Sequence, residues 1–178
     1  MTDPAEDPGW PVSWKMFVPW LRGMELRQFS KQGTLAGLRA IFVSFVVAIV
    51  LFGVVLALVV SSPTADFNTG LAAAIVAGVG VAMVVVGGVV GRLDGSSAEA
   101  LAGSYRSRFF VRIATSEAVA LVGFVLSFLT GDLVPYLVAM PFTAIGFWRA
   151  APTAQHLQED QDALNAQGAT VSLREVLR

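Results

Sequence analysis

The apolar residues of this chain fall in four long blocks and do not follow the spacing of a single helix face or of alternating strand positions. The blocks cover residues 40–60, 70–91, 109–129 and 133–148. About 20 helical residues are needed to cross ~30 Å of hydrocarbon. The last block is shorter and contains Pro135, which suits a first helical turn, and Pro141, which suits a kink. The pattern predicts an all-α, polytopic membrane protein with four transmembrane helices.

Apart from Arg112 inside the third block, lysine and arginine occur only on alternate flanks of the blocks. The connections 61–69 and 130–132 contain neither residue, whereas the other flanks carry Lys15, Arg22, Arg27, Lys31, Arg39, Arg92, Arg106, Arg108, Arg149, Arg174 and Arg178. Because positive residues favour the cytoplasmic side, both termini and the 92–108 connection are expected there. We therefore expect an integral protein of a bacterial inner (plasma) membrane with three parts: a cytoplasmic segment 1–39, a four-helix transmembrane domain 40–150 and a cytoplasmic tail 151–178.

The two flanks carry different signals. Trp10, Trp14 and Trp20 lie among basic residues before the first block, which is typical of an interfacial amphipathic helix. The tail is polar, and we expect it to be helical and solvated. Ser172 at the N-cap position and Glu175 three residues later predict a short terminal helix.

The composition excludes several classes of function. The chain is 55% hydrophobic and 14% charged, with a net charge of −1, so no basic excess indicates a nucleic-acid partner. It has no cysteine, and its single histidine, His156, lies in the polar tail, where we expect it to be solvated. Ser-His-Asp catalysis and a metal site are therefore not expected, and no cofactor is expected. The expected partners are the lipid bilayer and other membrane subunits or further copies of the chain.

The second block has small residues at a spacing of four. They are Gly70, Ala74, Gly78 and Ala82, and Gly87 and Gly91 repeat the spacing. Such stripes allow two membrane helices to approach closely. We favour packing of this stripe inside one four-helix bundle, and packing between copies is the alternative.

Glu117 is an acidic residue inside the third block. It lies eight residues after Phe109, or ~12 Å into the hydrocarbon, where a carboxylate costs roughly 2.5–3.5 kcal/mol, so the neutral form is favoured. Arg112 lies about 140° away around the helix, which argues against an ion pair within it. Thr115 and Ser116 have two options, a hydrogen bond to the carboxyl or one to their own backbone. Proton binding and helix packing remain equally open as roles for Glu117.

Residues 70–129 resemble the two-helix hairpin of the rotary ATPase c subunit, or proteolipid. A glycine-rich helix precedes a polar connection, and the next helix reads Glu-Ala-Val-Ala-Leu-Val-Gly from Glu117 to Gly123, of the form E-A-x-A-x-x-G. The resemblance implies that Glu117 is an ion-carrying carboxyl that faces an arginine on another subunit. Because Ala118 follows it and the second block is apolar, the resemblance implies a proton as the coupling ion.

The sequence leaves two functions open. The first is a non-enzymatic accessory or scaffold subunit of a larger membrane assembly, and we favour it because polar groups do not converge in the blocks. The alternative is a proteolipid-like subunit in which Glu117 binds and releases a proton.

Overall fold

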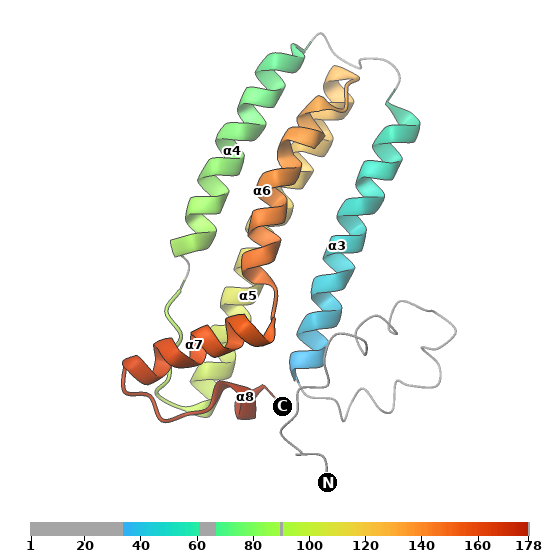
Figure 1. Ribbon diagram of the computed structural model, residues 1–178. Helices are drawn as coiled ribbons and strands as arrows, with labels where there is room; N and C mark the ends of the chain where they lie inside the picture. The colour runs from blue at the N-terminus through green and yellow to red at the C-terminus, as the bar shows by residue number, and fades with distance from the viewer. Residues whose placement is uncertain (1–33, 61–66, 90, 178) are drawn as a thin grey trace, which may run out of the picture. The chain divides into compact units, whose positions relative to one another are not determined.

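The computed structural model describes residues 34–60, 67–89 and 91–177, and all its regular elements are α-helices within these ranges (Figure 1). The helices are α3 (Thr34–Val59), α4 (Thr69–Val89), α5 (Ala98–Thr130), α6 (Val134–Ala150), α7 (Ala154–Ala166) and α8 (Leu173–Val176). The predicted all-α class is therefore confirmed. The interfacial helix expected around Trp10, Trp14 and Trp20 lies outside the described residues.

Each apolar block forms a helix. Within the described ranges, three helices are long and apolar enough to cross a membrane, namely α3, α4 and α5. The fourth block forms α6, which has 17 residues and continues through Pro141. Pro135 lies in the first turn of α6, as expected, where its missing N–H is not needed.

The connection between the second and third blocks is shorter than its polar sequence indicated. Helix α4 ends at Val89 and the 33-residue helix α5 begins at Ala98, so residues 90–97 connect the two helices. The run Ala-Glu-Ala-Leu-Ala consists of strong helix formers, which explains the extension. The Ser97 hydroxyl accepts a hydrogen bond from the Ala100 N–H at 3.1 Å and caps the helix start.

The chain divides into two compact units. The apolar unit contains Phe45–Gly91 and Ser107–Ala150, and the polar unit contains the described residues of Met1–Ser44, Arg92–Arg106 and Ala151–Arg178. In the apolar unit, α4 and α6 pack side by side (Figure 1). Val76, Val119 and Ala139 form a buried cluster there that joins α4, α5 and α6.

Three glycines let α6 approach its neighbours closely. A Cβ at Gly80 would lie 2.5 Å from the Phe142 ring, one at Gly123 would lie 2.7 Å from the Ala139 Cβ, and one at Gly53 would lie 3.1 Å from the Tyr136 ring. Their positions are on α4, α5 and α3, so every long helix of the apolar unit has a glycine at its contact with α6.

An aromatic cluster lies around Phe124 on α5. Its ring centroid is 5.1 Å from Phe52, 5.1 Å from Phe128 and 6.5 Å from Tyr136. The Tyr136 hydroxyl donates a hydrogen bond to the Ile49 carbonyl. Because a buried tyrosine hydroxyl needs a partner, this bond allows the ring to pack inside the unit.

The polar unit has a core of its own, and the expectation of a solvated tail was wrong. Leu157, Leu164, Leu173 and Leu177 are at most 1% exposed. The Leu35 N–H donates to the Leu177 carbonyl at 2.9 Å, which ties the chain end to the start of α3. Leu157 and Leu164 are seven residues apart on α7 and therefore share one face, a weak signal within a mainly polar sequence.

His156 also departs from the expectation. It is partly buried in α7, and its Nδ1 lies 2.8 Å from the Ala151 carbonyl oxygen. The predicted terminal helix is confirmed as α8, because the Ser172 hydroxyl accepts a hydrogen bond from the Glu175 N–H.

In the connection before α5, hydrogen bonds from the Ser96 side chain and backbone lower the pKa of Asp94.

Candidate functional site

Glu117 lies on α5 within the apolar unit, and its side chain is partly buried. It precedes Thr130, the last residue of α5, by 13 positions, which is about 20 Å along the helix axis. In the part of the chain that the structure describes, no hydrogen bond or ion pair is present at the Glu117 carboxyl group. The described residues around it therefore do not compensate for its charge.

The two hydroxyl residues beside Glu117 hydrogen-bond to the backbone. The Thr115 and Ser116 hydroxyls both donate to the Arg112 carbonyl, at 3.0 Å and 2.7 Å. Of the two options that the sequence left open for them, the structure shows the bond to their own backbone one turn back. As expected from the helical rotation, Arg112 is not directed towards Glu117. Its Nη1 donates to the Arg149 carbonyl at 3.3 Å.

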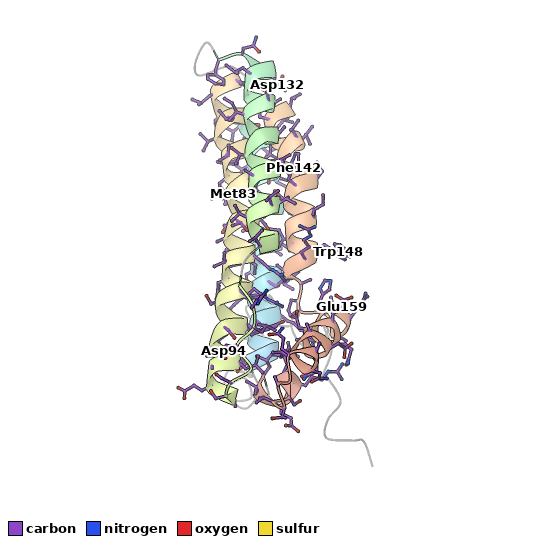
Figure 2. All side chains as sticks on the ribbon, turned by 90° about the vertical axis from the view of Figure 1, so that its left-hand side faces the viewer. Met83, Asp94, Asp132, Phe142, Trp148 and Glu159 are labelled. Atoms are coloured by element: carbon purple, nitrogen blue, oxygen red, sulfur yellow. The ribbon has the colours of Figure 1, made fainter. Side chains whose placement is uncertain are left out.

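A small pocket lies between α4, α5 and α6, near the Arg112 and Arg149 side chains. It is lined by Met83, Val84 and Gly87 from α4, by Arg112, Thr115, Ser116 and Val119 from α5, and by Phe142, Gly146 and Arg149 from α6. Met83 of α4 and Phe142 of α6, two of its apolar lining residues, are labelled in Figure 2. Two guanidinium groups and no carboxylate line this pocket, so it is positively charged.

Both arginines contact carbonyl groups near helix C-termini. Arg149 lies in the last turn of α6, and its Nη1 donates to the Val84 carbonyl of α4 at 3.4 Å. Helix C-termini carry partial negative charge, which a nearby cation stabilises. Helix α4 has no basic residue in its own last turn, so Arg149 supplies a cation near its C-terminus, and Arg112 donates to a carbonyl at the C-terminus of α6.

The small-residue stripe of α4 faces away from the rest of the apolar unit. Gly70, Ala74, Gly78 and Ala82 are all exposed, and a Cβ at Gly78 would meet nothing within 4 Å. The buried face of α4 instead carries Ala72, Val76 and Gly80. Positions two apart are separated by about 200° around a helix, which places the two sets on opposite sides. Packing of these four residues inside one bundle, which the sequence favoured, was therefore wrong.

The other two positions of the stripe behave differently. A Cβ at Gly87 would lie 3.3 Å from the Thr115 hydroxyl oxygen, so Gly87 packs against α5 as expected. Gly91 follows the end of α4 with a φ of +54°, a backbone conformation that favours glycine, and a Cβ there would meet nothing within 4 Å.

The sequence did not reveal the residues that bring α5 and α6 together. A Cβ at Gly146 would overlap the Ser116 hydroxyl and lie 2.8 Å from the Ser116 Cβ. The Thr143 hydroxyl donates to the Ser116 carbonyl at 3.4 Å. The sequence indicated only the membrane orientation of Arg149. Its contact with Arg112, 37 positions away, leaves no local pattern in the sequence.

Comparison of the chain with protein-family models, curated proteins and solved structures gives no match.

Proposed function

We propose that this chain is a four-span integral membrane protein and an accessory or scaffold subunit of a larger membrane assembly. The outward face of α4, formed by Gly70, Ala74, Gly78 and Ala82, is the surface on which a neighbouring subunit or a second copy packs. The observation that carries the proposal is the exposure of these four residues in a helix that is otherwise apolar.

The energetics of α4 support this use of the stripe. Glycine inside a helix costs about 1 kcal/mol relative to alanine. A Cβ at Gly78 would meet nothing within 4 Å among the described residues, so no close packing there offsets this cost. Lipid tails solvate a leucine as well as they solvate a glycine, whereas a neighbouring helix gains close backbone contact at small residues.

The role of α6 as a fourth span is part of the proposal. Its 17 residues give a length of about 26 Å, close to the thickness of the hydrocarbon layer. Its contacts with Gly53, Gly80 and Gly123 place it among the three longer apolar helices along its length. An even number of spans also fits the alternation of basic and uncharged connections, with both termini in the cytoplasm.

A pair of bulky substitutions tests the packing surface. We expect Ala74→Leu and Gly78→Leu to reduce the mass of the assembly that is purified in mild detergent, because each adds a side chain where a neighbouring helix approaches. Ala57→Leu is the matched control, since Ala57 is also exposed on an apolar helix and lies outside the stripe. Equal masses for all three variants and the wild type would overturn the proposed surface.

A proteolipid-like, proton-carrying role is the second candidate, and Glu117 favours it. A partly buried carboxyl group in a membrane helix without an ion pair in the described chain is a candidate for proton binding and release. Under this alternative, a neighbouring subunit supplies the positive charge that the described residues do not place beside Glu117.

A further inference from the structure

The pocket beside Arg112 and Arg149 contains two basic side chains, which helix packing alone does not require. Arg112 on α5 and Arg149 on α6 both line the pocket, and the Arg112 guanidinium donates a hydrogen bond to the Arg149 backbone carbonyl at 3.3 Å. No aspartate or glutamate lines the pocket. Arg149 is exposed and uses one N–H on Val84, and a guanidinium has five N–H donors in total.

The remaining polar groups of the pocket narrow the class of ligand. The Thr115 and Ser116 hydroxyls already donate their hydrogens to the Arg112 carbonyl. The donors that face a ligand are therefore guanidinium N–H groups, which match the planar pairs of oxygens in a phosphate or carboxylate. The apolar side of the pocket, formed by Met83, Val119 and Phe142, suits an anion attached to hydrocarbon.

The position of the pocket along the helices indicates the source of that anion. Arg112 precedes the last residue of α5 by 18 positions, about 27 Å along the axis. Arg149 follows the first residue of α6 by 15 positions, about 22 Å. If the far ends of α5 and α6 lie at one surface of a ~30 Å hydrocarbon layer, the backbones of the two arginines lie about 3–8 Å inside the opposite surface, a depth from which a long arginine side chain reaches the lipid phosphates.

We infer that Arg112 and Arg149 form a binding site for the phosphate group of an anionic lipid, with the lipid chains against the apolar side of the pocket. Basic pockets between membrane helices on the cytoplasmic side are a recurring form of lipid headgroup recognition. The inference rests on the membrane placement in the proposed function and is independent of the α4 packing surface. Because the arginines also contact helix C-termini, a bound lipid would hold α4, α5 and α6 together.

The test uses the full chain purified in a neutral detergent. Its thermal unfolding is followed while short-chain phosphatidylglycerol, short-chain phosphatidylcholine or glycerol phosphate is added. We expect phosphatidylglycerol to raise the midpoint of unfolding and the other two to have little effect. Because each charge-assisted bidentate contact is strong, Arg149→Gln and Arg112→Gln should each raise the half-saturating phosphatidylglycerol concentration about tenfold or more. Arg149→Lys should lie between the wild type and Arg149→Gln.

Arg92→Gln is the matched control, because Arg92 is an exposed arginine that does not line the pocket. It should respond to phosphatidylglycerol as the wild type does. Equal responses of the wild type and the double variant Arg112→Gln/Arg149→Gln would overturn the site. An equal, arginine-dependent effect of glycerol phosphate would overturn the lipid as the source and leave a site for free phosphate. The mass of the assembly, measured on the same samples, reports separately on the α4 surface, so the two proposals fail by different readouts.

Discussion

At the scale of single residues, Glu117 and Arg112 have separate environments although they are only five positions apart. The Arg112 guanidinium is directed to the end of α6, while the Glu117 carboxyl group accepts nothing from the described residues. A charged carboxylate in hydrocarbon costs several kcal/mol on most scales, roughly 2.5–3.5 on insertion scales, whereas a protonated one is much cheaper to bury. We therefore propose different functions for the two side chains, proton binding or subunit packing for Glu117 and lipid binding at the pocket for Arg112.

The environment of Glu117 predicts its reactivity. A protonated carboxyl group that is partly exposed to lipid should react with a hydrophobic carbodiimide, whereas water-exposed carboxylates are ionised and react poorly. We expect mass spectrometry of the protein labelled in membranes to find one main adduct, on Glu117. Glu117→Gln should abolish this adduct and leave the mass of the assembly unchanged if the scaffold function holds.

Two other results would change the interpretation of Glu117. An adduct on Asp132 instead, which follows α5 in a partly exposed connection, would show that Glu117 is shielded or ionised. Loss of the assembly in Glu117→Gln would show that the carboxyl group is required for subunit packing beyond what an amide of the same shape provides. Loss of proton movement in an intact assembly would support the proteolipid-like alternative.

At the scale of elements, the apolar unit depends on how closely α6 approaches α5. Gly146 and Ser116 meet with no room for a Cβ, and Thr143 adds a hydrogen bond to the Ser116 carbonyl. Ser116 and Thr143 are 5% and 3% exposed, so this contact excludes solvent and lipid. The same contact lies beside the Arg112–Arg149 pocket and therefore sets its width.

Gly146→Ala should destabilise the protein, because the added methyl group overlaps Ser116 and the two helices must separate. We expect a loss of about 1–3 kcal/mol in the free energy of unfolding, measured by denaturant titration in mixed micelles. Gly78→Ala is the control, since its Cβ meets nothing within 4 Å, and it should stabilise the isolated chain by up to about 1 kcal/mol. Equal stability of the wild type and Gly146→Ala would contradict the close approach of α5 and α6.

The positions of the helices could be predicted from the sequence, whereas the face that each helix buries could be predicted less well. The length of an apolar block determines where a helix forms, and α3, α4, α5 and α6 all lie on the predicted blocks. In contrast, the rotation of α4 depends on which neighbours it meets. Ala72, Val76 and Gly80 face inward, although the stripe through Gly78 has the same spacing of four and consists only of small residues. Small residues serve contacts within one chain and contacts between chains equally well, so their spacing alone does not distinguish the two.

In the polar unit too, local contacts could be predicted from the sequence and long-range contacts could not. The cap of α8 at Ser172 was predictable because it depends on residues within one turn. The packing of the tail depends in part on segments far away in the sequence: Leu164 lies beside Gly95, where a Cβ would be 3.2 Å from its side chain, and Leu177 accepts a hydrogen bond from Leu35. The pairing of Arg112 with the end of α6 was hidden for the same reason.

At the scale of the whole molecule, the number of spans decides on which side of the membrane the residues after α6 lie. Three helices qualify as spans by length and apolarity, and α6 is shorter. If α6 also crosses, residues 92–97 and 151–177 share one side and residues 131–133 lie on the other. If α6 does not cross, residues 151–177 share the side of residues 131–133.

The chain suits a direct test of these alternatives because it contains no native cysteine. Single variants Ser96→Cys, Asp132→Cys and Gln167→Cys place a thiol in each region, at positions that are partly or fully exposed. We expect a membrane-impermeant maleimide applied to intact cells to label Asp132→Cys, and to label Ser96→Cys and Gln167→Cys only after the membrane is opened, because arginine favours the cytoplasmic side. Labelling of Gln167→Cys together with Asp132→Cys in intact cells would reduce the count to three spans. In that case Arg149 would lie on the side opposite to residues 92–97, and the placement of the lipid phosphate site at the cytoplasmic surface would fail with it.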